Sequence, residues 1–130
     1  MSIPLEPDLQ EHTYNMAQEY NVHYEVIMAI MWHESRYQVD VPDNYNSNGT
    51  VDRGLAQINS CNWEWLNEKY SLDISNPYDN IEAAALILSQ YLVKYDIETA
   101  LACYAAGEYG AVELGSGRKF VKEILEIAKI

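Results

Sequence analysis

Apolar residues recur at helical spacing along most of the chain. The most continuous apolar run covers residues 26–32, and Glu34 follows it, seven residues after Ile27 and three after Met31. Positions separated by three or seven residues share one face of a helix. We therefore predict a buried helix from about residue 22 to residue 34, with a carboxyl group at the end of its apolar face.

The same spacing predicts further helices on both sides of this element. We expect them over residues 8–20, 63–70, 98–106 and 118–128, with another, strongly apolar on one face, after a turn at 76–80. Asp79, three residues before Glu82, resembles the start of a capping box. Gly107 is a typical stop signal for the helix before it.

Residues 38–53 break the helical pattern. They are rich in Asp, Asn, Ser, Gly and Pro, which favour turns, and a short apolar segment with Gln57 in its middle follows. The sequence thus predicts a mainly α fold with a small irregular or β-hairpin insertion around residues 38–60. With 130 residues, the chain 1–130 is long enough for one domain with its own core.

Charge and composition narrow the range of partners. Twenty acidic residues against eight basic ones give a net charge of −12, which makes nucleic acid an unsuitable partner. The same charge disfavours adhesion to anionic membranes or wall polymers. Eleven tyrosines and three tryptophans could instead line a groove that binds its substrate by hydrogen bonding and stacking, although most of these rings must serve as core or surface.

The remaining sequence signals concern thiols and export. Cys61 and Cys103 permit at most one disulfide, and we expect free thiols. Residues 1–8 lack the basic region and apolar core of a cleaved signal peptide. No apolar stretch approaches the roughly 18 residues of a membrane span, so we expect no membrane insertion.

Two carboxyl groups suggest chemistry. Burial would raise the pKa of Glu34 and keep it protonated at neutral pH, unless the side chain points into water at the helix end. Asp52 lies eighteen residues later in a polar loop. Glycoside cleavage needs a protonated acid for the leaving oxygen and a group that stabilises the oxocarbenium-like centre, and carboxyls in unlike environments can divide this work.

Metal chemistry fits the sequence less well. His33 and Glu34 could open a zinc-protease helix, but Tyr37 stands where the second histidine is required. The segment 44–49 resembles the first half of a calcium loop, yet Leu55 occupies the position of its bidentate glutamate. We expect no metal and no cofactor.

Four segments together resemble the ordered motifs of the soluble lytic transglycosylase domain: ESRY at 34–37, GLAQIN at 54–59, NPYDNI at 76–81 and ACYAAG at 102–107. The resemblance implies a lysozyme-like fold and cleavage of the β-1,4 bond between N-acetylmuramic acid and N-acetylglucosamine in peptidoglycan. It makes Glu34 the general acid and base. Gln57 becomes a substrate-binding amide on the groove floor, and Tyr104 orients the catalytic carboxyl. The substrate-binding residues carried over by position are Gln57, Tyr104, Ser35 and Ile58.

Two departures leave alternatives open. The family usually has asparagine where this chain has Ala105, so an amide beside the active site is missing. Residues 48–60 also resemble the stretch that carries the second catalytic aspartate of animal-type lysozymes, which would make Asp52 catalytic and the protein a true hydrolase. A third alternative is an inert wall-binding or structural module that has kept the fold alone.

The expected context follows from these interpretations. The expected partner is the glycan strand of peptidoglycan. We expect the protein to act on it as a monomer, on the extracellular or periplasmic side of the cell wall. Since the sequence shows no signal peptide, we expect delivery by another system, such as phage lysis, a phage tail, or a conjugation or secretion apparatus.

Overall fold

A computed structural model describes residues 3–129; residues 1, 2 and 130 of the predicted single domain 1–130 lie outside this range. The helices within it are α1 (Pro7–Tyr20), α2 (Tyr24–Ser35), α3 (Trp63–Tyr70), α4 (Pro77–Leu92), α5 (Ile97–Leu114) and α6 (Arg118–Ala128). A small antiparallel sheet is formed by β1 (Asn44–Tyr45), β2 (Val51–Arg53) and β3 (Ile58–Asn59), followed by the 3₁₀ turn η1 (Ser60–Asn62). The predicted mainly α fold with a β insertion is confirmed.

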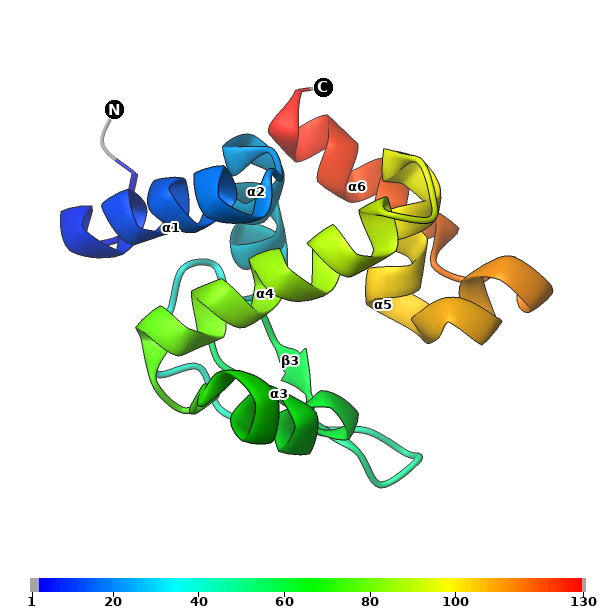
Figure 1. Ribbon diagram of the computed structural model, residues 1–130, viewed down its shortest axis with the longest axis horizontal. Helices are drawn as coiled ribbons and strands as arrows, with labels where there is room; N and C mark the ends of the chain where they lie inside the picture. The colour runs from blue at the N-terminus through cyan, green and yellow to red at the C-terminus, as the bar shows by residue number, and fades with distance from the viewer. Residues whose placement is uncertain (1–2, 130) are drawn as a thin grey trace.

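Helix α2 is the central element of the core. Its residues from Val26 to Met31 are all buried, and Ile27, Ile30 and Met31 are completely inaccessible. Such an all-round apolar helix must be covered on every side. Helices α1, α4 and α6 pack around it, while α4 crosses the molecule between the helical region and the part that contains α3 and the sheet (Figure 1).

The start of α4 corrects one prediction. Asn76, and not Asp79, is the N-cap: its side-chain oxygen accepts hydrogen bonds from the backbone N–H groups of Tyr78 and Asp79. Pro77 explains the earlier start, because proline is favoured in the first turn of a helix, where its missing N–H costs nothing. The carboxylate of Asp79 instead accepts from the backbone of Asp73.

The end of α5 corrects a second prediction. Gly107 has φ 78° and ψ 161°, so the helix bends sharply there, as expected of a stop signal, but it then resumes and continues to Leu114. The sequence therefore predicted the break and missed the second segment. Gly117, with φ 85°, then turns the chain into α6, whose predicted bounds are confirmed.

The helices between residues 3 and 129 include none with the length and apolar character needed to cross a membrane.

Candidate active site

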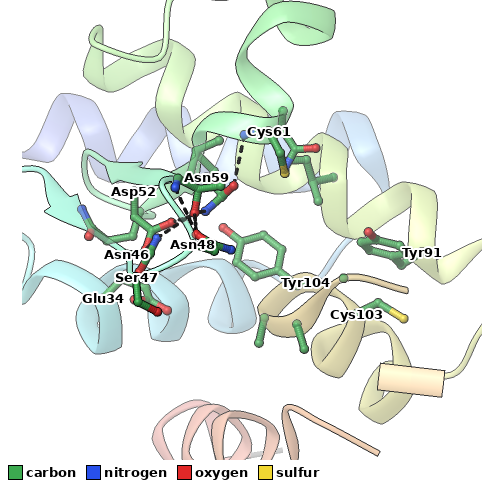
Figure 2. A pocket seen from close by; sticks show the side chains of 18 residues that line it. Glu34, Asn46, Ser47, Asn48, Asp52, Asn59, Cys61, Tyr91, Cys103 and Tyr104 are labelled. Carbon is green, nitrogen blue, oxygen red and sulfur yellow. Dashed lines mark hydrogen bonds between the residues drawn. The ribbon is translucent and has the colours of Figure 1, made fainter. Parts of the chain in front are cut away.

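A cleft of about 590 Å³ lies where the end of α2, the sheet, α4 and α5 meet. Four of the predicted catalytic and substrate-binding residues besides Glu34 line it: Asp52, Gln57, Ile58 and Tyr104. Figure 2 shows Glu34 and Asp52 toward one end of the cleft and Tyr91 and Cys103 toward the other, with Tyr104 between them. Residues that are far apart in the chain are thus gathered around one open space.

Glu34 is partly buried, with 27% of its side chain exposed. Burial raises the pKa of Glu34, because a carboxylate loses hydration when it leaves water; neighbouring His33 lowers this pKa, and the charge of Asp52 raises it. The prediction of a raised pKa is confirmed. The carboxyl group can therefore hold a proton at the edge of the cleft, as a general acid requires.

The motif around Glu34 fixes the end of α2. The hydroxyl of Ser35 is buried and donates to the carbonyl of Met31 at 2.9 Å, while Arg36 adopts a left-handed conformation (φ 54°) that ends the helix. The Tyr37 hydroxyl donates back to Met28 at 3.2 Å. Ser35 is absent from the residues that line the cleft, so the structure places it as a support of the helix end.

Asp52 is held by side-chain amides. In the sheet, Asp52 lies opposite Asn44 on one neighbouring strand and Asn59 on the other. Asn59 donates to one carboxylate oxygen at 2.8 Å, and Asn44 and Asn46 donate to the other at 3.2 and 3.1 Å. Cross-strand neighbours share one face of a sheet, so the strand register itself builds this cage of amides. It fixes the orientation of the carboxylate.

The turn at 54–57 forms the floor of the cleft. Gly54 has φ 82°, and Gln57 has φ 52° and donates from its side-chain nitrogen to the carbonyl of Gly54 at 3.0 Å. Asn80, 1% exposed, holds this turn from α4: it accepts from the N–H of Ala56 at 2.9 Å and donates to the carbonyl of Arg53 at 2.9 Å. The motif at 76–81 thus supports the motif at 54–59.

Tyr104 closes the cleft from α5. Its hydroxyl lies 3.3 Å from the carbonyl oxygen of Ala56 and donates to it, and no hydrogen bond joins it to Glu34 among residues 3–129. Burial raises the pKa of Tyr104, and the charges of Glu34 and Asp52 raise it further. Ala105 also lines the cleft, so the wall lacks the side-chain amide that the family resemblance would place there.

Few rings contribute to the cleft. Tyr91 and Tyr104 are the aromatic residues among its lining side chains, whereas Trp32, Trp63 and Trp65 are not part of the lining. The prediction of a groove rich in stacking surfaces is therefore reduced to two tyrosines, and the β insertion contributes polar lining residues from Asn46 to Asn59.

Both cysteines also reach the cleft, and both are free, as expected. Cys61 is exposed and Cys103 is buried. Desolvation raises the pKa of each thiol, so neither is activated as a nucleophile at neutral pH.

Several site residues were not predicted from the sequence. The turn-rich composition at 44–59 could have suggested that the asparagines of this segment bind a nearby carboxylate. The sequence suggests His33 only as a zinc ligand, and the structure places its Nδ1 atom 3.6 Å from Oε1 of Glu34. Glu123 of α6, whose carboxylate lies 2.5 Å from Nε2 of His33, gave no signal, because it lies in an ordinary amphipathic helix.

Comparison with known proteins now assigns the class. The model of the transglycosylase SLT domain family matches residues 12–123, and the chain therefore belongs to this family of peptidoglycan-cleaving enzymes. A solved structure, an inactive mutant of the lytic transglycosylase Slt from Pseudomonas aeruginosa, is similar over 97% of this chain with a TM-score of 0.72 and 19% sequence identity. This chain covers 24% of that one, and the likeness shows the fold. No curated protein sequence matches.

Proposed function

We propose that the protein is a lytic transglycosylase that cleaves the β-1,4 bond between N-acetylmuramic acid and N-acetylglucosamine in peptidoglycan. The observation that carries the proposal is Glu34, a partly buried carboxyl with a raised pKa at a polar cleft, in a chain of the transglycosylase SLT domain family. Burial favours the protonated form of this carboxyl, and a proton donor beside the glycosidic oxygen is what bond cleavage needs.

Glu34 acts twice in this mechanism. Its proton passes to the glycosidic oxygen as the bond to the muramic acid carbon breaks, and the N-acetyl group of that sugar assists the departure. The C6 hydroxyl of the same sugar then attacks the carbon and returns its proton to the Glu34 carboxylate. A 1,6-anhydro end forms, no water is consumed, and the enzyme regains its starting state.

Asp52 supports this route through its charge. Its carboxylate raises the pKa of Glu34 and supplies a negative charge at the cleft, where a positive sugar carbon develops. Asn44, Asn46 and Asn59 already occupy both of its oxygens. Attack by Asp52 on the sugar carbon would disrupt some of these hydrogen bonds, which favours a stabilising role over a nucleophilic one.

The test uses purified peptidoglycan and two variants. Glu34→Gln keeps the shape and removes the proton, so the rate should fall by about 10²- to 10⁴-fold. Asp52→Asn should slow the reaction and still yield anhydro-muropeptides in mass spectrometry. A Glu34→Gln variant that cleaves at nearly the wild-type rate would defeat the proposal.

A lysozyme-type hydrolase that uses both carboxyls is the second candidate, favoured by the presence of Asp52 in the same cleft as Glu34. Its products would each be heavier than the anhydro species by one water. Such products throughout the digest would replace the transglycosylase proposal with hydrolysis.

An inert wall-binding module remains the third alternative, motivated by Ala105. Clearing of a peptidoglycan suspension by the wild-type protein would eliminate it, while binding without clearing would establish it. The proposed monomer and its delivery by a phage, conjugation or secretion system are tested separately, by light scattering of the purified chain and by localisation in the native host.

A further inference from the structure

The ring of His33 lies between two carboxyl groups. Its Nε2 atom is 2.5 Å from Oε2 of Glu123 on α6, and its Nδ1 atom is 3.6 Å from Oε1 of Glu34. His33 and Glu123 are therefore hydrogen-bonded, whereas the distance between His33 and Glu34 is slightly too long for a hydrogen bond. Nδ1 is buried and has no hydrogen-bond partner among the described residues. This is an unused polar atom next to the proposed general acid.

Helix α6 fixes the ring in this place. Phe120 packs its ring at 85° to that of His33, with centroids 5.3 Å apart, and Tyr104 stacks on Phe120 with centroids 6.1 Å apart. Phe120 and Glu123 are three residues apart, so they lie on one face of α6. Phe120 holds the imidazole of His33 by packing, and Glu123 holds it by a hydrogen bond.

The hydrogen bond to Glu123 determines what Nδ1 can do. A carboxylate can accept but cannot donate, so Nε2 carries the hydrogen in this pair. Neutral His33 then presents a bare Nδ1 that can accept a hydrogen bond from protonated Glu34. Protonated His33 presents an N–H that can donate to the Glu34 carboxylate. Either bond needs a small approach of the two side chains.

Other charged and titratable groups lie near His33 and Glu34, on each of the neighbouring helices and strands. In the described part of the chain they are Arg36 next to α2, Lys119 and Glu123 on α6, Tyr104 on α5, and Asp52 on β2. Lys119, 91% exposed, lies 3.8 Å from Glu123 and is largely screened by solvent.

We propose that His33, anchored by Glu123, is a positioning residue for Glu34 that holds a proton beside the acid and stabilises the carboxylate left after proton transfer. The proposal rests on the proposed function of Glu34. During cleavage, the proton of Glu34 moves to the leaving oxygen, while His33 keeps both of its own hydrogens. The carboxylate then accepts the Nδ1 hydrogen until the C6 hydroxyl returns a proton to it.

This arrangement balances the effect of burial. Desolvation raises the pKa of Glu34, and His33 lowers it. A general acid works best when its pKa lies near the working pH, so a cation beside a buried acid corrects an excessive rise. Glu123 contributes by anchoring the ring through Nε2, which leaves Nδ1 facing Glu34.

The test measures the pKa of Glu34 directly, by carboxyl ¹³C NMR titration, together with kcat/KM on peptidoglycan against pH. Glu123→Gln and His33→Gln should both raise the pKa of Glu34 and move the alkaline limb of the profile to higher pH. They should also lower kcat by about tenfold, since a hydrogen bond to a charged group is lost. The control is Glu126→Gln, which removes the same charge at an exposed position of the same helix. It should leave the pKa of Glu34, the alkaline limb and kcat unchanged.

A double substitution separates this role from simple proximity. If Glu123 acts through His33, Glu123→Gln should not raise the pKa of Glu34 any further in a His33→Gln background. A pKa of Glu34 that is unchanged or lower in Glu123→Gln, or that rises equally in both backgrounds, would overturn the inference. Should His33→Gln fail to fold, the Glu123→Gln titration decides alone, since Glu123 lies at the surface and is 36% exposed.

The titration also separates this inference from the proposed function. A wild-type protein that leaves peptidoglycan intact, while the pKa of Glu34 responds to Glu123→Gln, would refute the activity and support the coupling. Active protein with an unmoved pKa of Glu34 and an unmoved alkaline limb would refute the role of His33 alone.

Discussion

Replacement of Asn80 by alanine should loosen the floor of the cleft from α4. The side chain of Asn80 is 1% exposed and makes three hydrogen bonds. It accepts from the N–H of Ala56 at 2.9 Å and donates to the carbonyls of Arg53 at 2.9 Å and Ile74 at 3.1 Å. A methyl group would leave all three backbone groups without this partner.

The expected loss follows from these contacts. A hydrogen bond in a protein contributes about 1 kcal/mol, so the three together contribute about 3 kcal/mol to the free energy of unfolding. A buried group left unsatisfied adds desolvation cost, and the vacated volume adds a cavity term. We expect Asn80→Ala to cost about 3 to 4 kcal/mol in total.

Urea unfolding followed by far-UV circular dichroism measures this difference. The matched control is Asn67→Ala, because Asn67 is exposed and donates a single long hydrogen bond, 3.4 Å, to Leu72. Its cost should stay below about 1 kcal/mol. At a temperature where Asn80→Ala remains folded, kcat/KM on peptidoglycan should also fall, since Gln57 and Ile58 lie on the floor that Asn80 supports.

The two variants together can refute the reasoning. A loss below about 1 kcal/mol for Asn80→Ala, equal to that of the control, would mean that water or a rearranged turn replaces the three hydrogen bonds. Full stability with lost activity would equally contradict it, because the proposed defect acts through the packing of the turn.

Two further predictions concern the titrating groups of the cleft. Glu34→Gln should raise the melting temperature at neutral pH, because burial raises the pKa of Glu34 above its ordinary 4.5 and so makes the ionised carboxyl more costly in the folded state than in the unfolded chain. The gain should disappear below pH 4.5, where the side chain of the wild type is protonated in both states. Thermal scans across this range test it, and an equal gain at all pH values would point to another cause. Tyr104→Phe removes the hydroxyl 3.3 Å from the carbonyl of Ala56, so it should cost about 1 kcal/mol and leave the alkaline limb of the kcat/KM profile in place. A shift of the alkaline limb would show instead that the hydroxyl of Tyr104 acts on Glu34.

Local patterns in the sequence were sufficient to locate most of the helices. The spacing of apolar residues located α2, α3 and α6 to within two residues, because an amphipathic or buried helix must repeat its apolar positions every turn. The cap of α4 was misplaced at Asp79, since Asn76 and Asp79 are both good capping residues and the position of Pro77 decides between them. Gly107 signalled a break, but whether the helix resumes depends on what the next segment packs against.

The candidate acid could also be found from the sequence. Glu34 follows an apolar run on the same helix face, which predicted burial and a raised pKa. The same spacing also allowed a side chain that points into water at the helix end, and the structure shows partial burial, with 27% of the side chain exposed. The position of Asp52 relative to it was not, because a polar loop of this composition can adopt many conformations. The register of three short strands places Asn44 and Asn59 on either side of Asp52.

Tertiary structure alone decided the contacts that tune the site. Glu123 is 90 residues from His33, and the two meet only because α6 packs against α2. Asn80 meets Ala56 across 24 residues through the packing of α4 under the turn. The sequence by itself determined where most of the helices lie and which carboxyl follows an apolar helix face, since these depend on near neighbours. Hydrogen bonds between distant side chains depend on how the helices and strands pack, and helical or strand periodicity carries no information about that.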